Sequence, residues 1–296
     1  MEKKLIYLPL LLLLLLFGCK GTPQAEPGHA EVSAETYEDP AYEAEPETEK
    51  PAETARPLSK YEYNWSGSDD MPDLVIIIDD FGNSAGQLLD DFADLPREIV
   101  FAVLPDLPHS KTAANLAARK GHEVIIHIPM EAENSSISPG VKFISKNMDE
   151  DRIKDVLDDF IAQMPMAVAA NNHMGSATTA NLSTMNKVIR HLGKNGLYFI
   201  DSATTGQSAV YTAAQEQGVF SAKRDIFLDV PDNSDGTLAA KIQSLGKFKG
   251  RREPIIIITH CHNREKLDAL NKFIVQIESM GMRIVSLRDA FPRTGV

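Results

Sequence analysis

The chain has 296 residues, of which 43% are hydrophobic and 24% charged, with 18 Gly, 17 Pro and 2 Cys. This composition excludes a collagen-like chain, wholesale disorder and a disulfide-stapled scaffold. The 30 Lys and Arg residues against 42 Asp and Glu give a formal net charge of −12. No nucleic-acid partner is expected, because such partners need clustered positive charge.

The first 19 residues have the pattern of a signal peptide. The charged start Glu2–Lys4 precedes an apolar run over residues 5–18 that only Pro9 interrupts. A helical span needs about 20 apolar residues, so the run fits a signal peptide better than a membrane anchor. It ends in Leu16–Cys19, which resembles the lipobox of bacterial lipoproteins. The resemblance implies that Cys19 is lipidated and anchors the protein to a membrane of the bacterial cell envelope, inner or outer. The alternative is an ordinary secretory signal.

Residues 20–70 are rich in Glu, Pro, Ala and Thr, and they carry 13 acidic and 4 basic residues. A stretch with so few aliphatic side chains does not bury enough apolar surface to offset its ordering entropy. We expect a disordered acidic linker, with a recognition tail as the alternative. Once Cys19 is acylated, Cys261 has no disulfide partner, so the domain at 71–296 depends on its apolar core.

Beyond Met71, short β-branched runs alternate with amphipathic segments, which is typical of βα units around a parallel sheet. Eight strands are expected, at residues 74–79, 99–104, 123–128, 167–172, 197–201, 219–222, 255–259 and 283–286. This number predicts an α/β fold of the (β/α) barrel type, as a distorted parallel barrel of seven or eight strands, rather than an open doubly wound sheet. No Gly-rich phosphate loop occurs, so a nucleotide cofactor is not expected.

Two of the connecting helices have clear sequence signals. Apolar residues recur with helical spacing over Ile153–Met164, where Asn147 is the expected cap, and again over Leu267–Ile277. For the second helix we expect Asn263 as the cap and Gly281 as the stop. Each helix is therefore predicted to bury one stripe against the sheet.

Polar side chains gather where the predicted strands end, which is the end of a (β/α) barrel that carries the active site. They are Asp79, Asp80, His127, Glu131, His173, Asp201, His260 and His262. Any one of them alone could be structural, as a loop cap or a satisfied core histidine. Together, two imidazoles and one carboxylate make a three-ligand site for Zn²⁺ or a similar divalent ion, with an open position for water. Such a site favours hydrolysis.

Five strings stand in order along residues 72–292, at Asp79–Gly82, Gly121–Val124, Asn171–Ser176, Tyr198–Ser202 and Thr259–His260. They resemble the polysaccharide deacetylases of the NodB-homology type, and their divergent branch most of all. The resemblance implies a metal-dependent hydrolase that removes N-acetyl or related acyl groups from envelope or extracellular carbohydrate.

The resemblance also implies a role for each matching residue. Asp79 is the general base, Asp80 and His127 bind the metal, and His260 protonates the departing amine. Apart from the resemblance, we expect Asp201 to orient a catalytic group or to bind sugar hydroxyls.

The sequence departs from the family pattern at two places. Glu131 stands where a second histidine usually follows His127, and His173 ends the next strand in place of an Arg-Pro motif. We therefore expect Asp80, His127 and His173 to hold the metal, with Asp80, His127 and Glu131 as the lesser choice. His262 is expected at the surface, with a reserve acid as the alternative.

Two other functions fit part of the pattern. The departures favour a catalytically weak glycan-binding or scaffold lipoprotein on the same fold, whereas the retained Asp79, Asp80 and His260 favour an enzyme. A glycosidase would need two carboxylates that flank the scissile bond. Asp79 and Asp201 are available for that, but the histidines would have no role.

Overall fold

A computed structural model describes residues 58, 60–65, 69–134 and 136–291. The expected signal peptide, the lipidation site Cys19 and most of the expected linker lie outside the described residues. Within those ranges, no helix combines the length and the apolar character needed to cross a bilayer.

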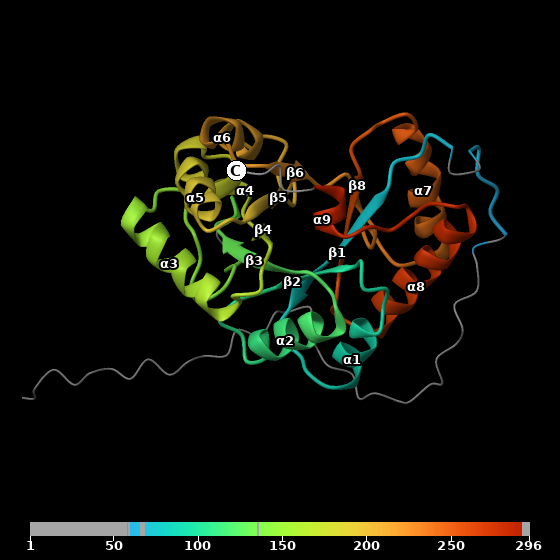
Figure 1. Ribbon diagram of the computed structural model, residues 1–296, viewed down its shortest axis with the longest axis horizontal. Helices are drawn as coiled ribbons and strands as arrows, with labels where there is room; N and C mark the ends of the chain where they lie inside the picture. The colour runs from blue at the N-terminus through green and yellow to red at the C-terminus, as the bar shows by residue number, and fades with distance from the viewer. Residues whose placement is uncertain (1–57, 59, 66–68, 135, 292–296) are drawn as a thin grey trace, which may run out of the picture. The chain divides into compact units, whose positions relative to one another are not determined.

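The described residues form one sheet of eight strands in the order β6-β5-β4-β3-β2-β1-β8-β7 (Figure 1). Every pairing in this sheet is parallel. Between its two edge strands, β6 and β7, the chain runs through only Arg224 and Asp225. The sheet is thus a curled half-barrel, and the predicted distorted (β/α) barrel is confirmed. The strands are β1 Leu74–Phe81, β2 Val100–Val103, β3 Val124–Met130, β4 Ala169–Met174, β5 Tyr198–Asp201, β6 Ser221–Lys223, β7 Ile226–Phe227 and β8 Ile255–His260.

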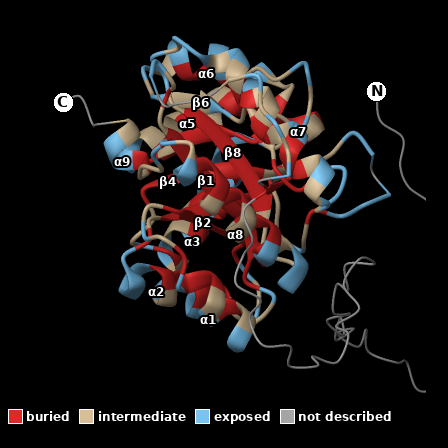
Figure 2. Cartoon of the chain, turned by 90° about the vertical axis from the view of Figure 1, so that its right-hand side faces the viewer, coloured by how far each residue is buried: buried red, intermediate tan, exposed pale blue. Residues whose placement is uncertain are grey.

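Helices cover the outer side of the sheet and turn their exposed faces to solvent (Figure 2). Asn263 caps α8 as predicted, since its side chain accepts a hydrogen bond from the Lys266 N–H. The predicted cap Asn147 is wrong for α3, because this helix begins at Glu150 and the preceding Asp149 takes that position. The helices are α1 Gln87–Ala93, α2 Ser110–Lys120, α3 Glu150–Gln163, α4 Ser176–Thr179, α5 Leu182–Lys194, α6 Val210–Gln217, α7 Asp235–Leu245, the 3₁₀ turn Gly246–Phe248, α8 Arg264–Ser279 and α9 Leu287–Ala290.

The central strands β1, β2 and β8 are buried on both faces, which explains why their sequences are largely continuous apolar runs. One face packs with the helices into the larger apolar cluster. The other face lines the inside of the curl with a smaller cluster that includes Val75, Ile77, Ile125, Ala169, Ile200, Ile256 and Ile258. Alternate residues of each strand therefore point into the curl, and this period sets which polar residues meet at its carboxyl end.

The expected strand at 283–286 is wrong. This segment makes one isolated bridge, from Ile284 to Leu74, and then enters α9. The Leu287 N–H of α9 donates to the Glu123 carboxylate over 2.7 Å, which places α9 at the amino end of β3. The eighth strand is instead β7, whose two residues are too short to give a sequence period.

The folded part begins earlier than the predicted boundary at residue 71. Leu58 is buried, and the Trp65 indole N–H donates to the Ile242 carbonyl over 3.0 Å. Lys60 also pairs with Asp235 on α7 at 2.8 Å. Leu58 and the aromatic residues near it bury apolar surface against the domain. They escaped the sequence analysis because residues 20–70 are polar on average.

Candidate metal centre

The strand period carries polar side chains to the mouth of the curl. After the inward-facing aliphatic residues, five of the eight strands continue their inward series with a polar group at or just after the carboxyl end. These groups are Asp79 on β1, His127 on β3, Asn171 and His173 on β4, Ser202 after β5 and His260 on β8. Six groups from five strands thus converge at the end of the barrel where active sites lie.

Asp80 reaches the same space although its neighbour Asp79 already points inward. The pairing of β1 with β2 shifts register between Ile78 and Phe81, and Asp80 has a φ of 72°. A positive φ is uncommon for a residue other than glycine, although Asp tolerates it better than most. The irregularity is typical of a bulge that re-aims a side chain beside a functional site.

Three candidate ligand atoms face one another. Asp80 Oδ1 lies 3.1 Å from His127 Nε2 and 3.0 Å from His173 Nδ1, and the two ring nitrogens are 3.3 Å apart. The group Asp80, His127 and His173 meets the spacing of a metal site, with all three ligand atoms within 4.8 Å of one another. The structure therefore brings together the three residues that the sequence analysis proposed.

The hydrogen bonds around this group turn one carboxylate oxygen and two ring nitrogens toward its centre. His127 Nδ1–H donates to Asn171 Oδ1 over 2.7 Å, so Nε2 is the nitrogen that offers a lone pair to a metal once its proton has left. Asp80 Oδ1 is buried and has no well-aligned hydrogen bond in the described structure, despite the two nearby ring nitrogens. Converging lone pairs of one carboxylate and two imidazoles need a positive charge between them, and this donor set suits Zn²⁺.

The pKa values of the acidic and imidazole groups in this centre are set by burial and by the charges of their neighbours. Burial lowers the pKa of His127, but the charges of Asp79 and Asp80 outweigh it and raise the pKa to about 9. Burial likewise raises the pKa of Asp80, yet His127, His173 and His262 together hold it well below its ordinary 3.8. For Asp79, burial prevails and raises the pKa.

A second cluster lies on β8 and beside it. His260 Nδ1–H donates to Asp229 Oδ2 over 2.9 Å, and the His260 backbone N–H lies 3.1 Å from the same oxygen. Lys266 on α8 donates to it as well, over 2.5 Å. Burial lowers the pKa of His260, but the hydrogen bond with Asp229 reverses the effect, so the pKa is raised. His260 also stands opposite Asp79 in the β1–β8 register.

Glu131, the alternative ligand, is held elsewhere. Its Oε2 accepts a hydrogen bond from the Lys146 backbone N–H over 2.9 Å, in the loop between β3 and α3. Asp201 follows the outward series of β5 after Phe199, and its Oδ1 accepts from the Ala203 N–H over 2.8 Å. The structure therefore does not bring Glu131 or Asp201 into the group of candidate ligands.

Comparison with known proteins shows the family of the chain. A model of the family described as divergent polysaccharide deacetylase matches residues 76–291, which is most of the chain. The chain belongs to this family.

The relatives found by sequence carry no assigned function. The chain is 41% identical over 192 residues to the uncharacterized protein YibQ of Escherichia coli K12, a match that covers 64% of this chain and 58% of that protein. An uncharacterized Haemophilus influenzae protein is 35% identical over 162 residues, covering 53% of this chain and 55% of its own length. The chain thus spans little more than half the length of these relatives.

A solved structure shares the fold. The crystal structure of the uncharacterized protein ATU2773 from Agrobacterium tumefaciens C58 superposes with a TM-score of 0.68 at 23% identity, over 79% of this chain and 94% of that one. At this identity, the likeness concerns the fold alone.

Several residues of this deacetylase-family centre escaped the sequence analysis. Asn171 links His127 to Asp79, because its Nδ2–H donates to Asp79 Oδ1 over 2.8 Å. Its place two residues before His173, on the same inward series, was an available signal. Asp229 follows the two-residue β7, where no period marks it. The expected surface position of His262 is wrong, since its Nε2 contacts Asp80 Oδ2 at 2.7 Å.

Proposed function

We propose that the protein is a metal-dependent hydrolase that removes N-acetyl groups from carbohydrate of the bacterial envelope. The observation that carries the proposal is the convergence of Asp80 Oδ1, His127 Nε2 and His173 Nδ1 beside the buried carboxyl of Asp79. Membership of the divergent polysaccharide deacetylase family supports the substrate class.

Asp80, His127 and His173 are the residues that would hold the metal, most simply Zn²⁺. When bound, such an ion supplies a Lewis acid that polarises a carbonyl and lowers the pKa of a coordinated water. Asn171 fixes the tautomer of His127 so that Nε2 faces the ion, and His262 holds the second oxygen of Asp80. Outer partners of this kind orient the ligands.

Asp79 is the proposed general base. Its Oδ2 lies 3.7 Å from His127 Nε2, at the edge of the ligand group, and its Oδ1 is held by Asn171. Burial raises the pKa of Asp79, which makes the carboxylate a better proton acceptor than an exposed one.

His260 is the proposed general acid. Because Nδ1–H is engaged by Asp229, Nε2 is the nitrogen that can give a proton to the departing amine. The raised pKa of His260 keeps the ring protonated at higher pH than an exposed histidine. Asp79 and His260 stand side by side on β1 and β8, so base and acid face one bound group from neighbouring strands.

The location of the protein is part of the proposal. We infer that Cys19 carries the lipid that anchors the protein to the cell envelope, where N-acetylated glycan is available. Metabolic labelling with a fatty acid tests this, since the wild type should be labelled and Cys19→Ala should not. Equal labelling of the two would contradict the anchor.

The activity test is acetate release by the full chain, loaded with Zn²⁺, from N-acetylglucosamine oligomers and from peptidoglycan. We expect release by the wild type and a loss of about 10²–10⁴-fold in Asp79→Asn, the range for a missing general base. Asp151→Asn, an exposed carboxylate on α3, is the matched control and should keep the wild-type rate.

The outcomes separate the proposal from its alternative. Release that persists in Asp79→Asn at the control rate would remove Asp79 from the mechanism. Tight zinc binding without acetate release from any N-acetylated substrate would favour the glycan-binding alternative instead.

A further inference from the structure

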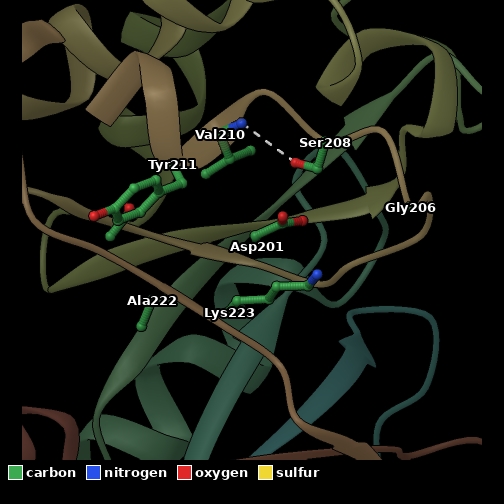
Figure 3. A pocket seen from close by; sticks show the side chains of 8 residues that line it. Asp201, Gly206, Ser208, Val210, Tyr211, Ala222 and Lys223 are labelled. Atoms are coloured by element: carbon green, nitrogen blue, oxygen red, sulfur yellow. Dashed lines mark hydrogen bonds between the residues drawn. The ribbon is translucent and has the colours of Figure 1, made fainter. Parts of the chain in front are cut away.

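A cavity of about 230 Å³ lies apart from the metal ligands, between the ends of β5 and β6 and the start of α6. Figure 3 shows side chains of Asp201, Ser208, Tyr211 and Lys223 around it. Pockets for drug-sized molecules have about 300–1,000 Å³, so this cavity suits a single small ring. None of its lining residues belongs to the proposed catalytic machinery.

Asp201 lines the cavity with a carboxylate. The residue is only 4% exposed, and its Oδ1 already accepts from the Ala203 N–H. Its Oδ2 is not among the buried oxygens without a hydrogen-bond partner in the described residues, so a ligand in the cavity can reach it. An accessible carboxylate oxygen accepts hydrogen bonds from the hydroxyl donors of a ligand.

Arg224 supplies a positive charge that interacts with Asp201, and two of its N–H groups donate to backbone carbonyls. Its Nε–H donates to the Ser202 carbonyl over 2.7 Å and its Nη2–H to the Ala203 carbonyl over 3.0 Å. The guanidinium also stacks on Phe227, 3.6 Å from the ring centre. It therefore fixes the turn beside Asp201 and leaves the free oxygen of Asp201 open to the cavity.

Tyr211 supplies the cavity with an aromatic face. The residue is 67% exposed, and its hydroxyl accepts from the Gln215 side chain over 2.8 Å, which fixes the ring on α6. An exposed aromatic ring beside a carboxylate is complementary to a pyranose. The apolar C–H face of the sugar packs on the ring, while its hydroxyls donate to the carboxylate. Ser208, Ser221 and Lys223 add polar groups at the rim.

The backbone joins this cavity to the candidate centre. Asp201 faces outward, and the next residue, Ser202, lies within 3.3 Å of Asn171 Nδ2. One peptide unit thus separates a wall of the cavity from the network that orients His127. An oligosaccharide that enters the centre with one unit can extend another unit over this turn.

We infer that the cavity is a saccharide subsite that binds one pyranose unit of the glycan whose neighbouring part occupies the metal centre. The identity of that glycan as substrate rests on the proposed function, whereas binding in the cavity does not require hydrolysis. Asp201 is then a residue for sugar hydroxyls.

The test is the affinity of the full chain for N-acetylchitotetraose, measured by isothermal titration calorimetry in the Asp79→Asn background so that the probe stays intact. We expect Tyr211→Ala to weaken binding about tenfold, as for the loss of one aromatic contact. Tyr211→Phe should keep the affinity, because the ring remains. Asp201→Asn should also weaken binding, since hydrogen bonds to a charged acceptor are stronger. Glu278→Gln, an exposed residue on α8, is the control.

Equal affinities of Tyr211→Ala and the control would overturn the subsite, as would the absence of binding by the parent protein at millimolar probe. Acetate release by the wild type, measured in parallel, keeps the two proposals distinct. A Tyr211-dependent affinity without acetate release retains the subsite and rejects the hydrolase. Acetate release together with an affinity that does not depend on Tyr211 retains the hydrolase and rejects the subsite.

Discussion

Asn171 offers the sharpest test of how the centre is held. The side chain is fully buried and hydrogen-bonds with His127 Nδ1 at 2.7 Å, Asp79 Oδ1 at 2.8 Å and Ser202 Oγ at 3.3 Å. Asn171→Ala leaves His127 Nδ1 and Asp79 Oδ1 without this partner at once. Each of these two buried groups left unpaired costs about 1–3 kcal/mol, so the metal-free protein should lose about 2–6 kcal/mol of unfolding free energy.

The same substitution should weaken zinc binding about 10- to 100-fold, the usual effect of removing a group that orients a ligand imidazole. Urea unfolding of the metal-free protein gives the first quantity, and competition with a chromogenic chelator gives the second. Asn186→Ala is the matched control, because this partly exposed amide on α5 also makes two side-chain hydrogen bonds, with Glu216 and Gln217. An Asn171→Ala protein with wild-type zinc affinity would refute the reasoning, whatever its stability.

Three further predictions concern pH, acid strength and the N-terminal segment. The pKa of His127 is raised to about 9 and its proton must leave before a metal binds, so zinc affinity should rise up to tenfold per pH unit toward pH 9. The stability that this proton gives the metal-free protein is complete below pH 6.5 and disappears as the pH rises through about 9. A zinc affinity that falls as the pH rises toward 9 would contradict the assignment of His127 as a ligand. Lys266→Met removes the positive charge that shares Asp229 with His260, so the pKa of His260 should rise and the alkaline limb of the pH profile of acetate release should move to higher pH. An unchanged alkaline limb would show that Lys266 does not influence the acid strength of His260. Trp65→Ala removes a packed ring and its hydrogen bond to α7, so urea unfolding should show a loss of about 2–4 kcal/mol, whereas no loss would mean that this segment does not contribute to the fold.

The fold was largely predictable from the sequence, because a parallel barrel buries both faces of its strands. Aliphatic runs such as Ile76–Ile78 and Ile255–Ile258 have no other explanation in a chain of this composition. The prediction failed where a strand has only two residues, as in β7, and where a β-branched run makes a single bridge, as at Ile284. Pairing in three dimensions decides such short segments, and local sequence does not.

The site residues that lie at the ends of long strands could be predicted from the sequence. Asp79, His127 and His260 each follow an aliphatic run, and parallel strands bring such ends together. Asp229 and Lys266 were not predictable, since one lies in a loop after β7 and the other in the first turn of α8. Only the packing of α8 against the barrel brings them to the same carboxylate oxygen.

His262 shows why spacing alone misleads. Two residues after His260, it stands outside β8, where a solvent-facing side chain is the ordinary expectation. Its contact with Asp80 Oδ2 depends on the turn at Asp80, whose φ of 72° the sequence does not reveal. Backbone irregularity of this kind is common at functional sites and is invisible to a reading based on strand period.

The central claim is that one divalent ion binds among Asp80, His127 and His173. Anomalous diffraction at the zinc edge, from crystals grown with zinc, tests this most directly. We predict a peak about 2.0–2.2 Å from Asp80 Oδ1, His127 Nε2 and His173 Nδ1, and its loss in His173→Ala but not in Glu131→Gln. A peak that survives in His173→Ala, or that includes Glu131, would contradict the account.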